Sequence, residues 1–424
     1  MSRLLYSILF YLAVPLVVLR VYWRSIKEPR YRSDLAQRFG FCPPSTGTER
    51  VWVHAVSAGE TIAAVPLIKA IVATGRKVLV TNMTPTGRAQ VERLLAEQLA
   101  AHSVVHCYVP YDLPGAVARF MRRSQPQALV IIDTELWPNL IHSAQQAGTR
   151  VLLLNARLSA RSAAGYGRIA TLTRDMLQKL DAVGVQSAVQ GQRFVQLGLP
   201  PARLHLTGSI KFDASQPQDT AQRVAEFRRQ LGERLVVVAG STHPGEEQLL
   251  LAALQPLQQR HSEILLVLVP RHHYRAPQVV QLCQAAGLQT QLRSRNSPCT
   301  AAHQVYVVDT MGELFYLYAC ADITFVGGSL VPVGGHNPME PASLGKPVIM
   351  GQYLRNIEDV ADLFIEQGGL LRVDSAAALG AALAQLCTSA EQRRNTGAAA
   401  LRTVAANGGA LAASLALLEA ALRA

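Results

Sequence analysis

VWVHAVSAGE, residues 51–60, joins a short apolar run to three small residues and an acid. The β-branched and aromatic residues predict a buried strand, Ser57-Ala58-Gly59 a tight turn, and residues 61–72 a helix. Glu60 then lies in the first turn of that helix. An acid there complements the helix dipole, which contributes roughly 0.3 to 1 kcal/mol. A structural and a functional role therefore both remain open for Glu60.

Similar apolar runs recur along the chain, separated by mostly amphipathic segments of helical character. This alternation is typical of βαβ units and a parallel sheet. The rhythm pauses near residue 204 and resumes near residue 235, so we predict an α/β protein with two doubly wound parallel-sheet domains. The predicted strands are 51–56, 78–82, 104–109, 128–133, 151–155 and 183–186, then 235–241, 264–270, 305–309, 323–328 and 347–350.

The length of 424 residues also favours two domains, because single cores rarely grow beyond roughly 250 to 300 residues. We predict an amino-terminal domain over 33–207, a linker over 208–220 and a carboxyl-terminal domain over 221–424. The last helix, 410–424, has no partner domain that the sequence identifies. Ligands of such sheets bind beyond the carboxyl ends of the strands, so we expect the substrates in the cleft between the two halves.

Charge and cysteine content restrict the class of protein. The formal net charge is +12, which favours anionic partners such as nucleic acid, anionic lipid or phosphorylated substrates. The six cysteines are scattered without a C-x-x-C pair, which indicates free thiols and no structural zinc site.

The amino terminus carries a stretch typical of a membrane anchor. Leu4 to Leu19 is apolar apart from Ser7, and at about 1.5 Å per residue it is slightly short of the roughly 30 Å hydrocarbon core. Spanning the bilayer and lying at its surface both remain open. Basic residues follow instead of a signal-peptide cleavage site, and they place the body on the cytoplasmic side. We therefore predict an anchor with a basic flank over 1–32.

Several predicted strands in the second half end in turns suited to anion binding. In GSTHPGEE (240–247), Ser241 and Thr242 either contact a phosphate or cap the following helix. Arg271, in PRH (270–272), follows the next strand, where a guanidinium suits a phosphate or carboxylate. Gly312 and Glu313 open a further helix in MGEL (311–314).

The strongest local signal is GGSLVPVGGHNPMEPASLGKPVIMG, residues 327–351. Its glycines, Gly335 among them, allow a ligand to approach the backbone. Asn337 and Pro338 are predicted as helix cap and first helical residue. Glu340 in the first turn can accept hydrogen bonds from the two hydroxyls of a ribose.

No P-loop is present, and no G-x-G-x-x-G follows the first strand. The second half is thus predicted to bind a nucleotide without Walker chemistry. A nucleotide site in one half and a carboxylate in the other suggest group transfer.

At these residues the chain resembles the 3-deoxy-D-manno-octulosonic acid (Kdo) transferases of lipopolysaccharide assembly, which have the two-domain GT-B glycosyltransferase fold. The matching segments run in order along most of the chain: HAVSAGE (54–60), TELWPN (134–139), IKFD (210–213), GSTHPGEE (240–247), PRH (270–272), MGEL (311–314) and GGHNPMEPA (334–342).

The resemblance implies inverting transfer of Kdo from CMP-Kdo to a hydroxyl of the lipid A precursor, an acylated and phosphorylated glucosamine disaccharide. It implies an enzyme at the cytoplasmic face of the inner membrane that touches anionic lipid, binds no nucleic acid and needs no cofactor or metal. Glu60 is the implied general base, with Ser57, Gly59 and Glu135 on the acceptor side. The implied donor contacts are Lys211, Ser241, Thr242, Arg271, Gly312, Glu313, Gly335, Asn337 and Glu340.

Glu60 meets one objection at this stage. A helix amino terminus favours the charged carboxylate, so we expect a low pKa, which weakens a base. Two rival functions also remain: another GT-B sugar-nucleotide enzyme, such as an epimerase or hydrolase, and a non-enzymatic membrane-tethered binder of nucleotide sugar or nucleic acid.

Overall fold

The computed structural model describes residues 1–42, 50–213, 217 and 219–424. The chain forms two compact units: Met1–Asp213 together with Gly408–Ala424, and Ala214–Asn407. Part of the predicted linker, residues 214–216 and 218, lies outside the described residues. The chain therefore leaves the first unit after Asp213 and returns to it at Gly408.

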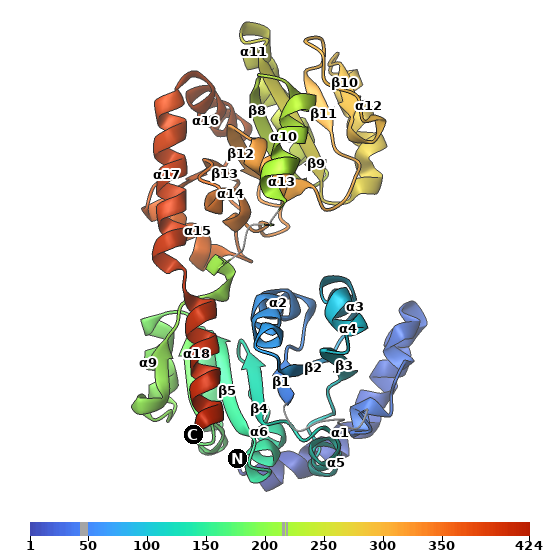
Figure 1. Ribbon diagram of the computed structural model, residues 1–424, viewed down its shortest axis with the longest axis vertical. Coiled ribbons are helices and arrows are strands. Elements are labelled where there is room, and N and C mark those ends of the chain that lie inside the picture. Colours follow the sequence, from blue (N-terminus) through green and yellow to red (C-terminus); the bar gives the residue numbers. More distant parts are fainter. Residues whose placement is uncertain (43–49, 214–216, 218) are drawn as a thin grey trace. The chain divides into compact units, whose positions relative to one another are not determined.

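The first unit is built on a seven-stranded parallel sheet with the strand order β3-β2-β1-β4-β5-β6-β7 (Figure 1). In β1, Trp52 faces one apolar cluster while Val51 and Val53 face another, so both faces of the sheet are buried. The strands are β1 (Arg50–His54), β2 (Lys77–Asn82), β3 (Val104–Tyr108), β4 (Ala128–Ile132), β5 (Arg150–Ala156), β6 (Ala182–Val185) and β7 (Leu204–Leu206).

Helices cover both faces of this sheet. One face carries α2 (Ala58–Ala73), α3 (Pro85–Leu94), α4 (Ala96–Ala100) and α18 (Ala410–Arg423). The other carries α5 (Pro114–Ser124), α6 (Pro138–Gln146), α7 (Ala160–Gly167), α8 (Ala170–Leu177) and α9 (Ala188–Gln196). Single turns complete the unit: η1 (Pro29–Arg32), η2 (Gln37–Phe39), η3 (Pro201–Arg203) and η4 (Ile210–Asp213).

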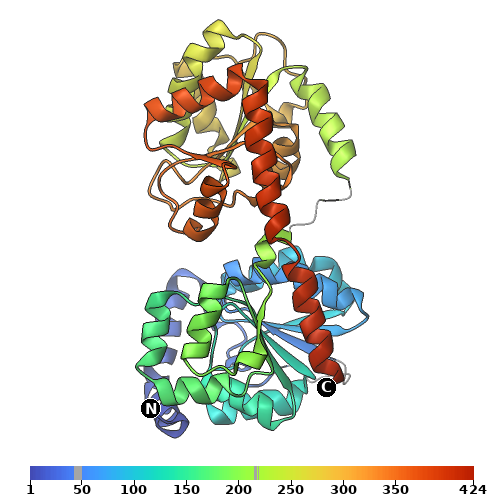
Figure 2. The ribbon, with the colours of Figure 1, turned by 90° about the vertical axis from the view of Figure 1, so that its left-hand side faces the viewer.

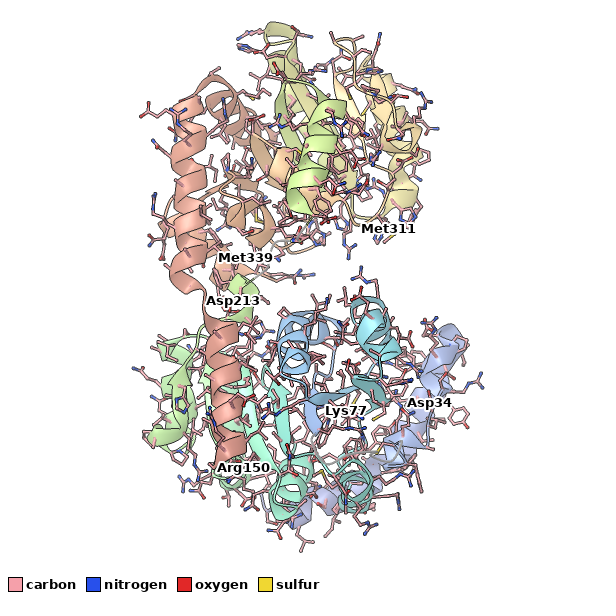
Figure 3. All side chains as sticks on the ribbon, viewed as in Figure 1. Asp34, Lys77, Arg150, Asp213, Met311 and Met339 are labelled. Atoms are coloured by element: carbon pink, nitrogen blue, oxygen red, sulfur yellow. The ribbon has the colours of Figure 1, made fainter. Side chains whose placement is uncertain are left out.

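The last helix, whose partner the sequence left open, belongs to the first unit. Ala410 and Leu418 of α18 join the same apolar cluster as Leu67 and Ile68 of α2. Asp213 caps α18, because its carboxylate accepts hydrogen bonds from the backbone N–H groups of Gly409 and Leu411. Figure 2 shows α18 in red along this unit, and Figure 3 labels Asp213 next to its start. The last residue of IKFD thus has a structural role.

The second unit repeats the plan with a parallel sheet of order β10-β11-β9-β8-β12-β13-β14. Its strands are β8 (Leu235–Thr242), β9 (Ile264–Pro270), β10 (Thr290–Leu292), β11 (Val305–Val307), β12 (Ile323–Val326), β13 (Val348–Met350) and β14 (Leu370–Arg372). Its helices are α10 (Thr220–Leu231), α11 (Glu246–Arg260), α12 (Ala276–Ala285), α13 (Leu314–Cys320), α14 (Met339–Ser343), α15 (Glu358–Glu366), α16 (Ala376–Thr388) and α17 (Ala390–Asn407), with single turns η5 (His273–Arg275) and η6 (Arg293–Arg295).

The predicted fold class is confirmed, and each of the eleven predicted strands lies in one of the two sheets. Three strands were missed: β7, β10 and β14, each three residues long and at the edge of its sheet. An edge strand has one neighbour and needs fewer apolar residues, so it leaves a weaker pattern.

The amino-terminal helix, α1 (Arg3–Lys27), is longer than the apolar stretch predicted at 4–19. Among the described residues, Arg3–Ile26 and Ala390–Arg423 are long and apolar enough to cross a membrane, by length and composition alone. The second of these stretches combines α17 and α18.

Candidate active site

Several of the predicted site residues lie near the point in each sheet where the strand order reverses. This reversal falls between β1 and β4 in the first unit and between β8 and β12 in the second. Doubly wound sheets bind ligands just beyond the carboxyl ends of the strands at such a point. In the first unit Glu60 lies in the first turn of α2 and Glu135 in the loop after β4; in the second, Ser241 lies at the end of β8 and the glycine loop 327–336 follows β12.

Glu60 is held by the turn that precedes it. Its Oε2 accepts a hydrogen bond from the Val56 backbone N–H at 2.7 Å, and its Oε1 accepts one from the Ser57 hydroxyl at 2.7 Å. The Ser57 Oγ in turn accepts from the Glu60 N–H at 3.3 Å. Ser57 is thus the side-chain cap of α2, and these contacts fix the carboxylate at the junction of β1 and α2.

The pKa of the Glu60 carboxyl is raised above its ordinary value, and the main cause is burial. The Ser57 hydrogen bond acts in the opposite direction, while the negative charge of Glu135 raises the pKa further. The expectation of a low pKa was therefore wrong, because desolvation and a neighbouring acid outweigh the hydrogen bonds of the helix start. A raised pKa makes Glu60 a stronger base.

Glu135 lies in the loop after β4 and is half-buried. Its Oε2 accepts a hydrogen bond from the Trp137 indole N–H at 3.0 Å. Burial raises the pKa of this carboxyl, and Asp133 raises it further. Asp133 has a positive φ of 63° and accepts from the Asn155 amide at 2.8 Å. A non-glycine residue in this conformation costs of order 1 to 3 kcal/mol, so the loop stores strain beside Glu60.

The other two predicted acceptor-side residues differ in their solvent exposure. Gly59 is exposed, whereas Ser57 is half-buried and serves as the cap of α2. A Cβ built on Gly59 meets only the Ser57 Oγ, at 3.9 Å. Packing within the first unit therefore does not require glycine at position 59.

In the second unit, the loop after β8 is held by two buried acids. Thr242 is fully buried and its hydroxyl donates to Glu247 at 2.9 Å, while Arg275 pairs with the same carboxylate at 2.8 and 3.3 Å. Neither Ser241 nor Thr242 caps α11; the cap is Gly245. These contacts favour a structural role for Thr242, and a donor contact through its side chain stays an untested prediction.

Glu246 occupies the position at the start of α11 where we expected a phosphate. It is fully buried and accepts four backbone hydrogen bonds, from His243 (2.9 Å), Gly328 (2.7 Å), Ser329 (3.0 Å) and Leu330 (2.9 Å). A Cβ on Gly327 would lie 2.4 Å from the Ser241 carbonyl oxygen. The glycine loop is thus bound to the β8 loop by its backbone.

Two histidines that the sequence did not single out meet at this loop. The Nε2 atoms of His243 and His336 lie 2.8 Å apart and their rings stack with centroids 5.1 Å apart. Burial, followed by the charge of His243, lowers the pKa of His336 to about 4. One ring donates an N–H hydrogen bond to the other, which orders the loop close to the exposed Arg271 and His272. The two residues are 93 positions apart, so no local pattern could pair them.

Glu340 is a half-buried carboxylate without a hydrogen-bond partner for its oxygens among the described residues. Burial raises its pKa. The predicted start of its helix was one residue early: Pro338 is the cap of α14, and the Asn337 Oδ1 accepts from the Met339 N–H at 3.1 Å. Gly335 is buried, and its N–H donates to the Gly328 carbonyl at 2.6 Å, which closes the glycine loop.

The remaining predicted donor contacts, Glu313, Gly312 and Lys211, lie in different surroundings. Glu313 accepts from Arg293 at 3.0 and 3.1 Å and from Arg223 at 2.9 Å. Burial opposes ionisation, but the hydrogen bond from Arg293 and its neighbours holds the pKa of Glu313 below its ordinary value. This pairing favours a structural role. Gly312 is exposed with a φ of 81°, and Lys211, on η4, belongs to the first unit.

In the part of the chain that the structure describes, no group of three or more His, Cys, Asp or Glu side chains is arranged to hold a metal ion. The six cysteines are free.

Comparison with known proteins identifies the family. A family profile described as 3-Deoxy-D-manno-octulosonic-acid transferase (kdotransferase) matches residues 33–214. The 3-deoxy-D-manno-octulosonic acid transferase of Haemophilus influenzae is 37% identical over 99% of this chain and 98% of its own length. That of Bordetella pertussis is 36% identical over 99% of both chains.

A solved structure shows the fold independently. The UDP-GlcNAc 2-epimerase of Neisseria meningitidis, solved with UDP-GlcNAc, covers 87% of this chain and 99% of its own with a TM-score of 0.59. At 14% sequence identity this likeness establishes architecture and nothing further. The relatives that match over nearly the whole chain show that it belongs to the 3-deoxy-D-manno-octulosonic acid (Kdo) transferases, glycosyltransferases with the GT-B fold.

Proposed function

We propose that this chain transfers Kdo from CMP-Kdo to a hydroxyl of the lipid A precursor, at the cytoplasmic face of the inner membrane. Membership of the Kdo transferase family supports Kdo as the sugar that is transferred. The observation that carries the mechanism is Glu60, a carboxylate fixed at the carboxyl end of β1 whose pKa is raised by burial and by Glu135.

In the proposed reaction, Glu60 removes the proton of the acceptor hydroxyl as the oxygen attacks the anomeric carbon of Kdo. CMP leaves from the opposite face, so the configuration inverts in one displacement. General base catalysis of this kind contributes typically 10²- to 10⁴-fold. The hydrogen bonds from the Val56 N–H and the Ser57 hydroxyl hold the carboxylate in place, which reduces the conformational freedom lost on reaching the reactive geometry.

On the donor side, the support is strongest for Arg271 and Glu340. Arg271 is exposed just beyond the carboxyl end of β9, where a guanidinium can offset the charge of a leaving phosphate. The unpartnered carboxylate of Glu340 can accept hydrogen bonds from two ribose hydroxyls. Because the leaving group is a nucleoside monophosphate, little extra charge develops, and we propose that no divalent metal is required.

The acceptor accounts for the amino-terminal helix and the basic surface. A phosphorylated lipid embedded in a leaflet requires an enzyme at the membrane, and anionic lipid attracts basic segments by about 1 kcal/mol per Lys or Arg near the surface. Arg24, Arg30 and Arg32 supply such charge.

The test is Kdo transfer by the full-length protein from CMP-Kdo to purified lipid A precursor, with and without EDTA, analysed by mass spectrometry. We expect a product that carries added Kdo in both conditions, and its mass counts the sugars. Release of free Kdo without acceptor product would favour the hydrolase alternative, and a product that forms only without EDTA would contradict the metal-free mechanism.

A further inference from the structure

The amino-terminal helix α1 is attached to the first unit from its first turn. The Arg3 guanidinium donates to the Asn139 Oδ1 at 3.1 Å, and the Ser7 hydroxyl lies 3.1 Å from the same oxygen. One turn further on, the Tyr11 hydroxyl accepts from the Gly115 N–H at 3.4 Å. Ser7 is 5% exposed, so its contact is shielded from solvent. These contacts tie α1 to the starts of α5 and α6.

One apolar face continues this attachment along the helix. Tyr6, Phe10, Val14 and Val17 pack against buried residues of the body, at spacings of three and four that place them on one side of α1. Near the other end, where α1 packs against η1, Ser25 is 2% exposed. A spanning helix needs about 20 residues inside the hydrocarbon core. In α1 the residues that contact the body lie inside the apolar stretch that would have to enter this core, so spanning would break the attachment.

The opposite face of α1 is apolar and exposed. Large hydrophobic side chains there have exposures between 47 and 78%. Contiguous exposed apolar patches mark interaction sites. The residues are Leu4, Leu5, Ile8, Leu9, Leu12, Leu16, Leu19, Tyr22, Trp23 and Ile26.

The charge next to this face identifies its partner. Arg20 and Arg24 are exposed on α1, Arg30 and Arg32 are exposed on η1, and the first acidic residue of the chain is Glu28. A second copy of the chain docked through this face would bring like charges together. An anionic lipid surface instead offers hydrocarbon to the leucines and phosphates to the arginines.

We propose that α1 lies in the plane of the membrane surface, docked on anionic phospholipid through its leucine-rich face, and does not cross the bilayer. The amino terminus then lies on the same side of the membrane as the body. The proposal rests on the first unit alone and is independent of the sugar that is transferred.

The position of the amino terminus tests this directly. Ser2→Cys is introduced into the full-length protein together with Cys299→Ser and Cys387→Ser, because the other cysteines are buried. Inverted membrane vesicles from cells that express it are treated with a membrane-impermeant maleimide, before and after detergent. Ser262→Cys in the same background reports the exposed body. We expect both cysteines to react fully before detergent; labelling of Ser2→Cys only after detergent would show that α1 spans the bilayer.

A second experiment tests the lipid. Leu9→Ser with Leu16→Ser changes the proposed face, and Leu206→Ser with Leu401→Ser changes equally exposed leucines elsewhere. Each purified variant is sedimented with phosphatidylcholine vesicles with or without phosphatidylglycerol. We expect the α1 variant to lose about tenfold or more of its vesicle affinity, with the control unchanged and wild-type binding stronger on anionic vesicles. Equal binding by both variants would overturn the proposal, and a change from dimer to monomer mass alone would assign the face to a second copy.

Discussion

Glu246 offers a quantitative test of how the second unit builds its glycine loop. Its carboxylate is fully buried and accepts backbone hydrogen bonds from His243 and Gly328 on Oε2 and from Ser329 and Leu330 on Oε1. Glu246→Gln keeps the shape of the side chain but replaces one acceptor oxygen with an amide group. Whichever oxygen is replaced, two of the four N–H groups lose their acceptor.

The magnitude follows from these contacts. A buried N–H without an acceptor costs about 1 to 3 kcal/mol, so two such groups cost about 2 to 6 kcal/mol. Each 1.36 kcal/mol is a factor of ten in an equilibrium constant, so the lower limit corresponds to about 30-fold more frequent opening of the loop.

Hydrogen exchange read by mass spectrometry measures this opening at the loop itself. We expect exchange in a peptide covering 327–332 to accelerate by about 30-fold or more in Glu246→Gln, and CMP to bind more weakly to the same variant. Glu366→Gln, an exposed acid in the last turn of α15, is the matched control. A peptide from β9, a buried strand of the second unit, reports whether this unit is folded in the variant.

Exchange in 327–332 within about threefold of wild type, in a variant whose β9 peptide is unchanged, would refute the reasoning. The four hydrogen bonds would then contribute little to the loop.

Three further predictions concern the site residues. Glu135→Gln removes a charge that raises the pKa of Glu60. Because a general base acts in its deprotonated form, the acid limb of the pH profile of kcat/KM should move to lower pH. An acid limb at the wild-type pH would show that the charge of Glu135 does not influence the catalytic base. Gly59→Ala should fold normally because its Cβ meets only Ser57 Oγ, yet raise the KM for the acceptor; an unchanged acceptor KM removes Gly59 from that site. Glu340→Ala should raise the KM for CMP-Kdo roughly 10- to 100-fold, the value of a hydrogen bond to a charged group, and leave the acceptor KM unaltered; equal changes in both would point to misfolding.

The parts of the fold that the sequence revealed are those in which local pattern and burial coincide. Central strands such as β4 and β9 are buried on both faces and appear as continuous apolar runs. The edge strand β10 reads TQL and offers no such run. The place of α18 could not be predicted, because its cap, Asp213, is almost 200 positions away along the chain.

The site residues show the same difference between local patterns, which the sequence reveals, and long-range contacts, which it does not. The turn that holds Glu60 is local, so the position of Glu60 followed from ten residues. The partners that engage Glu313 and Thr242 are distant in sequence or lie on other elements: Arg293 in one case, Glu247 and Arg275 in the other. Long-range side-chain pairs of this kind decide whether a carboxylate or hydroxyl remains available to a ligand, and no single-sequence pattern records them.

The raised pKa of Glu60 has the same origin. The sequence shows the helix start, which favours a charged carboxylate, but not the burial or the approach of Glu135 from the loop after β4. The sign of the shift therefore depended on tertiary structure.

The most direct test of the central claim is the rate of Kdo transfer by Glu60→Gln at saturating CMP-Kdo and acceptor. Glu97→Gln is the control, since Glu97 is also a first-turn acid of a first-unit helix, α4, and is exposed. If Glu60 is the general base, kcat falls by about 10²- to 10⁴-fold while both KM values and the thermal unfolding profile stay close to wild type. A kcat within about threefold of that of Glu97→Gln, far below the effect expected of a lost base, would contradict the account and leave Glu60 as a structural acid at the start of α2.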